Sequence, residues 1–394
     1  MTATNQKVIP GLVWMLAALT ALAPLSIDAY LPAFPLMAED LLVSVHDIEL
    51  TLSLFLGGFA LGQLAGGPIS DHWGRRTAIV CGLSIFSLGS IGIILSDSIG
   101  VLWGSRFLQA LGGGISVINS AAIVRDLYRG ADSARAMSRI AAIMMVAPML
   151  APALGSLLLM VTGWRSIFIV LQVYCLILLW VLWVHLPETR RHDPSRLPLN
   201  LAQRYREIIL HKKAMGYLLS VAFGNGGMFA FITGSATVYL TYYSVSTAMY
   251  PLLFGLNVLM ILVCNQINAR IVHIFGPQKI LLTAQATQVV IGITALLCIL
   301  FTPHPLSLLI PLIIAFMGLQ GFVMSNGMSC TIEFFPHSAA SATALTGAAG
   351  FTLGAFAGAA VGLLGDGTPL PMVSVMTGAV GLGLCIRYFL HRTP

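Results

Sequence analysis

Apolar residues occur along this chain in long runs that are separated by short polar stretches. A helix needs about 20 mostly apolar residues to cross a bilayer core roughly 30 Å thick. Such runs occur at residues 8–30, 49–70, 78–96, 99–124, 136–160, 165–186, 215–241, 250–271, 280–301, 306–330, 339–363 and 371–389. The pattern therefore predicts an all-α integral membrane protein with twelve transmembrane helices.

One long polar stretch divides the twelve runs into six and six. It covers residues 187–214 and is rich in arginine and proline. We expect it to be a cytoplasmic linker between an N-terminal six-helix bundle, residues 1–186, and a C-terminal six-helix bundle, residues 215–394. This layout is typical of two-bundle transporters.

A weak internal repeat supports the division into halves. The segment Arg270–Lys279 follows the eighth run as Gly67–Arg76 follows the second. His273 stands three residues before Gly276, as Asp71 stands three residues before Gly74.

Composition and charge agree with a membrane protein. Hydrophobic residues make up 57% of the chain and charged residues 9%, too few to cover a water-facing surface. Of the 20 basic residues, 18 fall in loops on one side together with both termini, while Arg165 falls on the other side and Arg106 within a run. The positive-inside rule therefore places both termini in the cytoplasm. The net charge of +6 indicates contact with anionic membrane lipid, and we infer no nucleic-acid partner from it.

Two charged residues stand out inside the predicted spans. Asp28 lies near the end of the first span, between Pro24 and Pro32, and Arg106 lies in the fourth. A carboxylate within the membrane is costly and suggests a function, with Arg106 as its natural partner. A change in their distance or hydration would load or release a proton. The alternatives are that Asp28 is interfacial and that Arg106 is a clamp on backbone carbonyls.

Several classes of chemistry find no support. The chain has no phosphate-binding Gly-x-x-x-x-Gly-Lys loop and no nucleophile with a base, and its nine histidines lie in loops or at span ends. The six cysteines show no close pairing. We therefore expect no metal and no cofactor, only a proton gradient as the energy source. An intramembrane enzyme would have only Asp28 and Arg106 for its chemistry.

Glycines recur at four-residue spacing in two spans. Small residues at this spacing let membrane helices approach closely. The pattern predicts that the second and eleventh spans meet across the two halves; the alternative is packing within each bundle only. The rows are Gly58, Gly62 and Gly66 in the second span and Gly350, Gly354, Gly358 and Gly362 in the eleventh.

The most specific motif is Gly67-x-x-Ser70-Asp71-x-x-Gly74-Arg75-Arg76. It resembles the loop signature of the major facilitator superfamily, and the resemblance covers all twelve spans. The segments Pro24–Pro35, Arg106–Ala110, Arg125–Tyr128 and Glu333–Ala339 are similar to the Bcr/CflA group of drug:proton antiporters. Members of that group export bicyclomycin, phenicols and related antibiotics from Gram-negative cells.

The resemblance implies roles for the motif residues. Asp71 would cap a helix of the other half, and Arg75 would pair with Asp126 at the end of the fourth span, so that both contacts hold an outward-open state. The alternative is that this loop, with Arg75 and Arg76 after Gly74, is only a positive cluster that sets the topology.

The fifth span resembles an antiporter motif through Pro148, Pro152 and Gly155, although alanine replaces the usual glycine before the first proline. By resemblance, spans 1, 4, 7 and 10 line a central cavity. For each candidate side chain on these spans, the alternative to contact with the ligand is ordinary packing between helices. The candidates are Tyr30, Gln109, Asn119, Asn225, Phe229, Phe231, Tyr239 and Asn326.

The sequence thus predicts a monomeric, multi-pass protein of the bacterial inner membrane that exchanges a small amphipathic drug for a proton by rocker-type alternating access. An exporter of a sugar or amino acid is the alternative on the same fold. An intramembrane enzyme is a remote alternative.

Overall fold

The computed structural model describes residues 11–189, 201–302, 305–335 and 339–392. Among these residues, twelve helices are long and apolar enough to cross a membrane, which confirms the twelve predicted spans. The chain is therefore a multi-pass membrane protein with an all-α fold.

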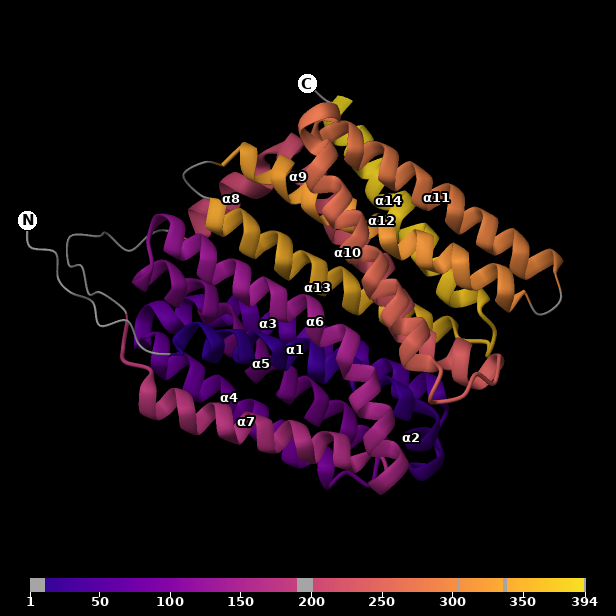
Figure 1. Ribbon diagram of the computed structural model, residues 1–394, viewed down its shortest axis with the longest axis horizontal. Helices are drawn as coiled ribbons and strands as arrows, with labels where there is room; N and C mark the ends of the chain where they lie inside the picture. The colour runs from indigo at the N-terminus through magenta and orange to yellow at the C-terminus, as the bar shows by residue number, and fades with distance from the viewer. Residues whose placement is uncertain (1–10, 190–200, 303–304, 336–338, 393–394) are drawn as a thin grey trace, which may run out of the picture.

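The first group of helices packs mainly around α5, which contacts both α3 and α4. It occupies the indigo-to-magenta part of Figure 1. Its elements are α1 (Leu12–Asp28), η1 (Leu31–Ala33), α2 (Phe34–Asp40), α3 (Val45–Trp73), α4 (Arg75–Ile94), α5 (Ile99–Leu127), α6 (Gly130–Thr162) and α7 (Arg165–His185).

The second group packs mainly around α9, which contacts α13, α14 and α12. It forms the orange-to-yellow part of Figure 1. Its elements are α9 (Lys212–Ala236), η2 (Thr237–Tyr242), α10 (Tyr250–Phe275), α11 (Pro277–Phe301), α12 (Leu306–Glu333), α13 (Ala339–Leu364) and α14 (Leu370–Arg392). Between the groups lies the short helix α8 (Leu201–Leu210).

Two irregular segments interrupt the α-helical spans. The first span leaves the α-helix after Asp28, continues through the short 3₁₀ turn η1 and resumes as α2 up to Asp40. Pro32 in η1 has no N–H to extend a helical ladder. In the seventh span, α9 passes into the π-helical segment η2. Such segments are rare and frequently lie at functional sites.

The helix α3 begins four residues earlier than the sequence pattern predicted. Ser44 and Asp47 form a reciprocal capping box that starts the helix at Val45. Glu49 therefore lies within the first turns of α3, where only 1% of its surface is exposed. Glu49, which the sequence pattern placed at the very start of this span, is therefore a second buried acid beside Asp28.

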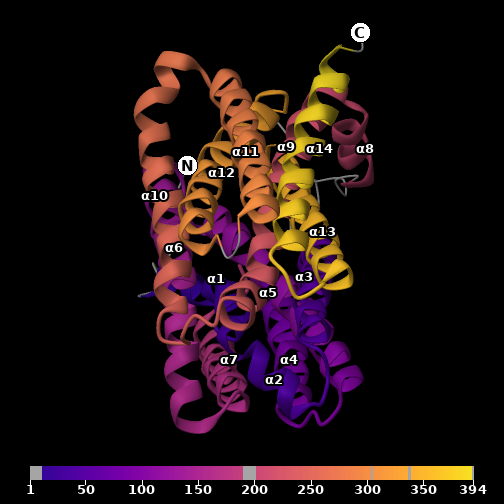
Figure 2. The ribbon, with the colours of Figure 1, turned by 90° about the vertical axis from the view of Figure 1, so that its right-hand side faces the viewer.

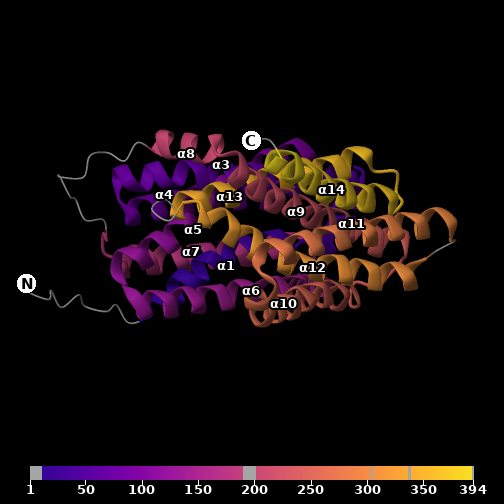
Figure 3. The same cartoon turned by 90° about the horizontal axis from the view of Figure 1, so that it is seen from above.

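The two groups touch mainly along two helix pairs. α3 packs against α13, and α6 packs against α10. Figures 2 and 3 show these pairs on opposite sides of the molecule. The predicted meeting of the second and eleventh spans is thus confirmed.

The glycine rows take different roles from the predicted ones. Gly58, Gly62 and Gly66 all face the backbone of α5 within the first group, so this row serves packing within its own group. On α13, Gly350 and Gly354 face α9, whereas Gly358 and Gly362 face Ser53 and Leu50 of α3. Only the later half of the α13 row contributes to the contact between the groups.

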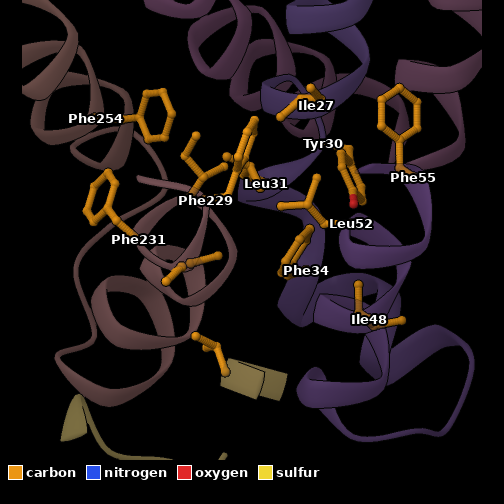
Figure 4. Packing of buried hydrophobic residues seen from close by; sticks show 14 of the residues in the cluster. Ile27, Tyr30, Leu31, Phe34, Ile48, Leu52, Phe55, Phe229, Phe231 and Phe254 are labelled. Atoms are coloured by element: carbon orange, nitrogen blue, oxygen red, sulfur yellow. The ribbon is translucent and has the colours of Figure 1, made fainter. Parts of the chain in front are cut away.

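The two ends of the molecule differ in how the groups share a hydrophobic core. We call the end where α3 begins the distal end, and the end where α3 stops at Trp73 the linker end. At the distal end one cluster of buried residues joins both groups, and Figure 4 shows Ile27, Leu31 and Phe34 beside Phe229, Phe231 and Phe254. The clusters at the linker end do not join them: one lies in the first group, a second in the second group, and a third joins α8 to α9 and α13.

Candidate functional site

Asp28 is the last residue of α1 and lies where the two groups meet. Its residue surface is 3% exposed, and its Oδ1 atom accepts no hydrogen bond from the described residues. Its neighbours Ile27 and Ala29 share a cluster of buried residues with Tyr250 of α10, in the second group. The hydroxyl of Tyr250 shares a hydrogen bond of 2.8 Å with Ser235 Oγ. A buried carboxyl group without a hydrogen-bond partner is costly, so its surroundings favour the neutral form.

Arg106 is fully buried in the first group and is held by its own neighbours. Its Nη1 donates to Gln109 Oε1 at 2.7 Å, and its Nη2 donates to the carbonyl oxygen of Ser26 at 3.1 Å. The guanidinium also lies 4.1 Å from the ring centroid of Tyr30 and 4.5 Å from that of Phe55. Cation–π contacts of this kind gain strength when water is excluded.

The structure does not join Asp28 and Arg106 directly. None of the ion pairs among the described residues contains either side chain. Arg106 instead clamps a backbone carbonyl, which was the alternative considered for it. Because Ser26 lies two residues before Asp28, Arg106 fixes the last turn of α1, whose carbonyls lack partners within the helix.

The helix α6 carries the predicted antiporter motif and faces both groups at the distal end. Pro148 and Pro152 lie inside this helix. Gly155 lies so close to α1 that a Cβ added there would overlap the carbonyl oxygen of Ala29. The next residue, Ser156, donates to the carbonyl oxygen of Thr247 in the second group at 3.0 Å. The motif therefore sits beside Asp28 and at the contact between the groups.

At the linker end, the charged motif centres on Arg75. Its Nε donates to Asp126 Oδ2 at 3.1 Å, as the resemblance implied, and its Nη1 donates to Asp71 Oδ1 at 2.6 Å. The same Nη1 donates to Ser70 Oγ at 2.8 Å. Arg75 thus ties the end of α3 to the end of α5.

Gly74 is the single residue between α3 and α4, and it has a φ of 97°. This left-handed conformation suits glycine. Glu188 lies directly against Gly74, where an added Cβ would overlap its carboxylate, and accepts bonds from the backbone N–H groups of Arg75 at 2.9 Å and Arg76 at 3.2 Å. The sequence reasoning missed this acid, which caps the first turn of α4.

The predicted cap formed by Asp71 on a helix of the other half stays a prediction. The residues immediately before α13, 336–338, lie outside the described part of the chain. In α8, burial raises the pKa of Tyr205, and the nearby Asp71 carboxylate raises this pKa further. Asp71 therefore lies near α8. Since Ile208 of α8 packs with Leu218 and Ala342, Asp71 is close to a helix that packs on the second group.

The predicted cavity residues separate into several places. Tyr30 and Gln109 belong to the Arg106 cluster, where Gln109 Nε2 also donates to Ser90 Oγ at 2.9 Å. Phe231 and Tyr239 belong to the distal cluster, of which Tyr30 and Phe229 are also members. Asn119 and Asn326 each donate to a carbonyl of their own helix, and Asn326 also bonds Asn268.

Asn225 and Phe229 lie on the part of α9 that faces α13. Asn225 is half-buried and accepts a bond from Gln320 Nε2 at 3.1 Å. Phe229 begins a series of aromatic contacts that crosses to the first group through Phe351, at 5.6 Å, and Phe59, at 4.8 Å between ring centroids. Phe59 and Phe351 were missed because phenylalanine within an apolar span carries no distinguishing signal in a single sequence.

The comparisons with known proteins agree with this architecture. Residues 16–359 match the Major Facilitator Superfamily. The chain is 31% identical to a bicyclomycin resistance protein homolog of Haemophilus influenzae, over 95% of this chain and 94% of that protein. It is 34% identical to the uncharacterized MFS-type transporter YdgK of Bacillus subtilis, over 94% and 93%.

A solved structure gives the same fold. The crystal structure of a bacterial homolog of the human lysosomal transporter Spinster matches with a TM-score of 0.74, covering 97% of this chain and 96% of that one at 16% identity. The family match, the relatives and the twelve spans lead to one conclusion. The chain belongs to the Major Facilitator Superfamily.

Proposed function

We propose that this protein is a proton-coupled exporter of small amphipathic antibiotics, working as a monomer by rocker-type alternating access. The observation that carries the proposal is Asp28, a buried carboxyl group at the contact between two groups of helices. The 31% identity to a bicyclomycin resistance protein homolog supports a drug as the substrate. No cofactor is needed, because a proton gradient supplies the energy.

We assign the linker end to the cytoplasm of a bacterial inner membrane, following the positive-inside rule. The two halves, residues 1–186 and 215–394, then move about the contacts between them, with residues 187–214 as the cytoplasmic connection. The described clusters join the halves at the distal end and not at the linker end, which supports an inward-facing state for this structure.

In this cycle Asp28 carries the exchanged proton. Protonation from the outside removes the charge of Asp28, which lowers the free-energy cost of burying this side chain. It therefore favours the inward-facing state, in which the distal end is closed. Release of that proton to the cytoplasm then accompanies drug binding and the change to the outward-facing state. Arg106 acts on Asp28 by positioning the turn that carries it.

The aromatic series through Phe229, Phe351 and Phe59 supports an amphipathic rather than a strongly polar substrate. Apolar and aromatic surfaces with few polar groups are typical of sites for such ligands. A sugar would instead need a dense set of hydrogen-bonding groups around it. An amino acid would need partners for both of its charges.

A resistance panel tests the substrate class. The protein is produced in a bacterium that lacks its main drug exporters, and minimal inhibitory concentrations are measured for bicyclomycin, phenicols and lipophilic cations. We expect resistance to at least one of them and no change in growth under overload with sugars or amino acids. The reverse outcome, relief of metabolite overload without drug resistance, would favour the metabolite exporter.

Replacing Asp71 with asparagine is expected to slow transport several-fold without weakening drug binding. The substitution removes the charge that meets Arg75 at 2.6 Å at the linker end, far from the distal contact. Such an exposed pair contributes only about 0–1 kcal/mol, so the balance of states shifts modestly. Transport rate and drug binding are measured on the same purified variant. Lost binding with a normal cycling rate would contradict this role.

The exposed pair of Asp132 and Arg135 provides a control. Asp132→Asn removes a similar charge from an i,i+3 pair on α6, away from the motif. It should leave both the rate and the affinity unchanged.

A further inference from the structure

Glu49 is a buried acid at the distal end that the exchange mechanism above does not use. Its side chain lies on α3, in the first group, and its surface is 1% exposed. On its own helix, Oε2 lies 3.0 Å from Nδ1 of His46. A carboxylate withdrawn from water needs such partners, because burying it without them costs several kcal/mol.

The second partner of Glu49 belongs to the other group of helices. The hydroxyl of Thr237 donates a short hydrogen bond to Glu49 Oε1. Thr237 is the first residue of the π-helical segment η2, at the point where α9 changes its hydrogen-bonding pattern. The other hydrogen bond described above between the two groups, from Ser156 to Thr247, ends on a backbone carbonyl, whereas this one ends on a carboxylate.

The surrounding contacts are fitted to this arrangement. Gly365, just after α13, lies flat against the ring of His46, where an added Cβ would overlap the ring. One turn earlier, Gly362 packs on Leu50. The charged groups near His46 are Glu49, Asp47 and, from the loop after α13, Asp366. Glu49 is thus buried against η2, while His46, whose side chain is 26% exposed, lies against the end of α13.

We propose that His46, Glu49 and Thr237 form a latch that holds the distal end closed, with Glu49 as the group that both halves share. This inference rests on the alternating opening proposed above. When the distal end opens, α3 must separate from η2 and α13, and Glu49 must exchange its bond to Thr237 for water. The latch therefore sets the balance between the closed and open distal end independently of which substrate is carried.

Thr237→Val tests the latch, because valine keeps the shape of threonine and removes only the hydroxyl. Thr233→Val is the matched control, since Thr233 lies one turn earlier, is also buried, and its hydroxyl makes no hydrogen bond with the described residues. Spin labels at the exposed distal positions Leu42 and Ala248, in a variant without the native cysteines, report the distance between the groups. Measurements are made on the full chain in lipid nanodiscs with and without drug.

We expect Thr237→Val to raise the ratio of open to closed molecules about tenfold, in line with the loss of a hydrogen bond to a charged group. Thr233→Val should leave the ratio unchanged. In a Glu49→Ala background, Thr237→Val should have no additional effect, because the two residues act through one bond.

Two outcomes would overturn the latch and are distinct from failure of the proposed function. An unchanged ratio in Thr237→Val, or an equal shift in Thr233→Val, would show that the hydroxyl of Thr237 does not hold the distal end. A single distance in every variant and condition would instead contradict alternating opening itself. Transport measurements on the same variants then show whether export occurs by another route.

Discussion

Asp28→Asn is expected to abolish drug accumulation driven by a proton gradient while leaving drug binding intact. Asparagine has the shape of the neutral carboxyl group but cannot take up or release a proton. Because Asp28 is 3% exposed and its Oδ1 is unpartnered among the described residues, the substitution leaves no buried charge and should be tolerated by the fold. Drug uptake into inverted membrane vesicles, with and without an imposed pH gradient, measures the effect.

The variant should still exchange labelled drug for unlabelled drug at equal concentrations, since that process needs no net proton movement. Asp132→Asn, at an exposed position of α6, should accumulate drug as the wild type does. Gradient-driven accumulation by Asp28→Asn at the wild-type level would place the proton on another group. Glu49, the other buried acid described above, would then be the next residue to test.

Gly155→Ala is expected to cause a large loss of transport, although it changes no charge. The added Cβ would overlap the backbone carbonyl of Ala29, which cannot move aside as a flexible side chain can. Overpacking of this kind costs about 1–3 kcal/mol, which corresponds to a change of about 5- to 150-fold in an equilibrium between states. The substitution also forces α6 away from the turn that carries Asp28.

Gly104→Ala is the matched control for this experiment. Gly104 lies within α5, and an added Cβ there would meet nothing within 4 Å. Alanine should even favour the helix slightly. Initial rates of drug transport and thermal stability of the purified proteins distinguish the two variants. A normal rate for Gly155→Ala would show that the close contact between α6 and α1 is dispensable.

The fold could be predicted from the sequence because the bilayer imposes a length on every spanning helix. The twelve apolar runs correspond to the twelve candidate membrane-spanning helices among the described residues, and the errors lie at their ends. The start of α3 shows the cause of these boundary errors. Ser44 and Asp47 cap the helix through side-chain hydrogen bonds, which a count of apolar residues does not take into account. Had that capping box been recognised, Glu49 would have been placed one turn inside the helix and not at its start.

The site was less predictable, because its contacts depend on which helix faces which. The pair of Arg75 and Asp126 followed from a specific motif and is present at 3.1 Å. Arg106 and Asp28 both lie within candidate membrane-spanning segments, yet Arg106 takes its partners from Gln109 and the Ser26 carbonyl. Opposite charge alone cannot reveal that such local partners take both Nη atoms of the arginine, while its Nε has no hydrogen-bond partner among the described residues.

Contacts between the two halves were the hardest to foresee. The bond from Thr237 to Glu49 joins residues 188 positions apart, and neither lies in a recognisable motif. The glycine row of the second span likewise faces α5 and not the other half. Glycines at four-residue spacing indicate a helix face that permits close packing, but they do not indicate which helix packs there.

The central claim is that export of a drug is exchanged for protons, and proton release from energised inverted vesicles tests it most directly. Vesicles containing the protein are acidified inside, a pH-sensitive dye reports the gradient, and bicyclomycin, phenicols and lipophilic cations are added in turn. We predict that at least one drug causes protons to leave the vesicles with the wild-type protein, and that the signal is absent with Asp28→Asn and without the protein. No drug-evoked proton movement in vesicles that contain the folded wild-type protein would contradict the account.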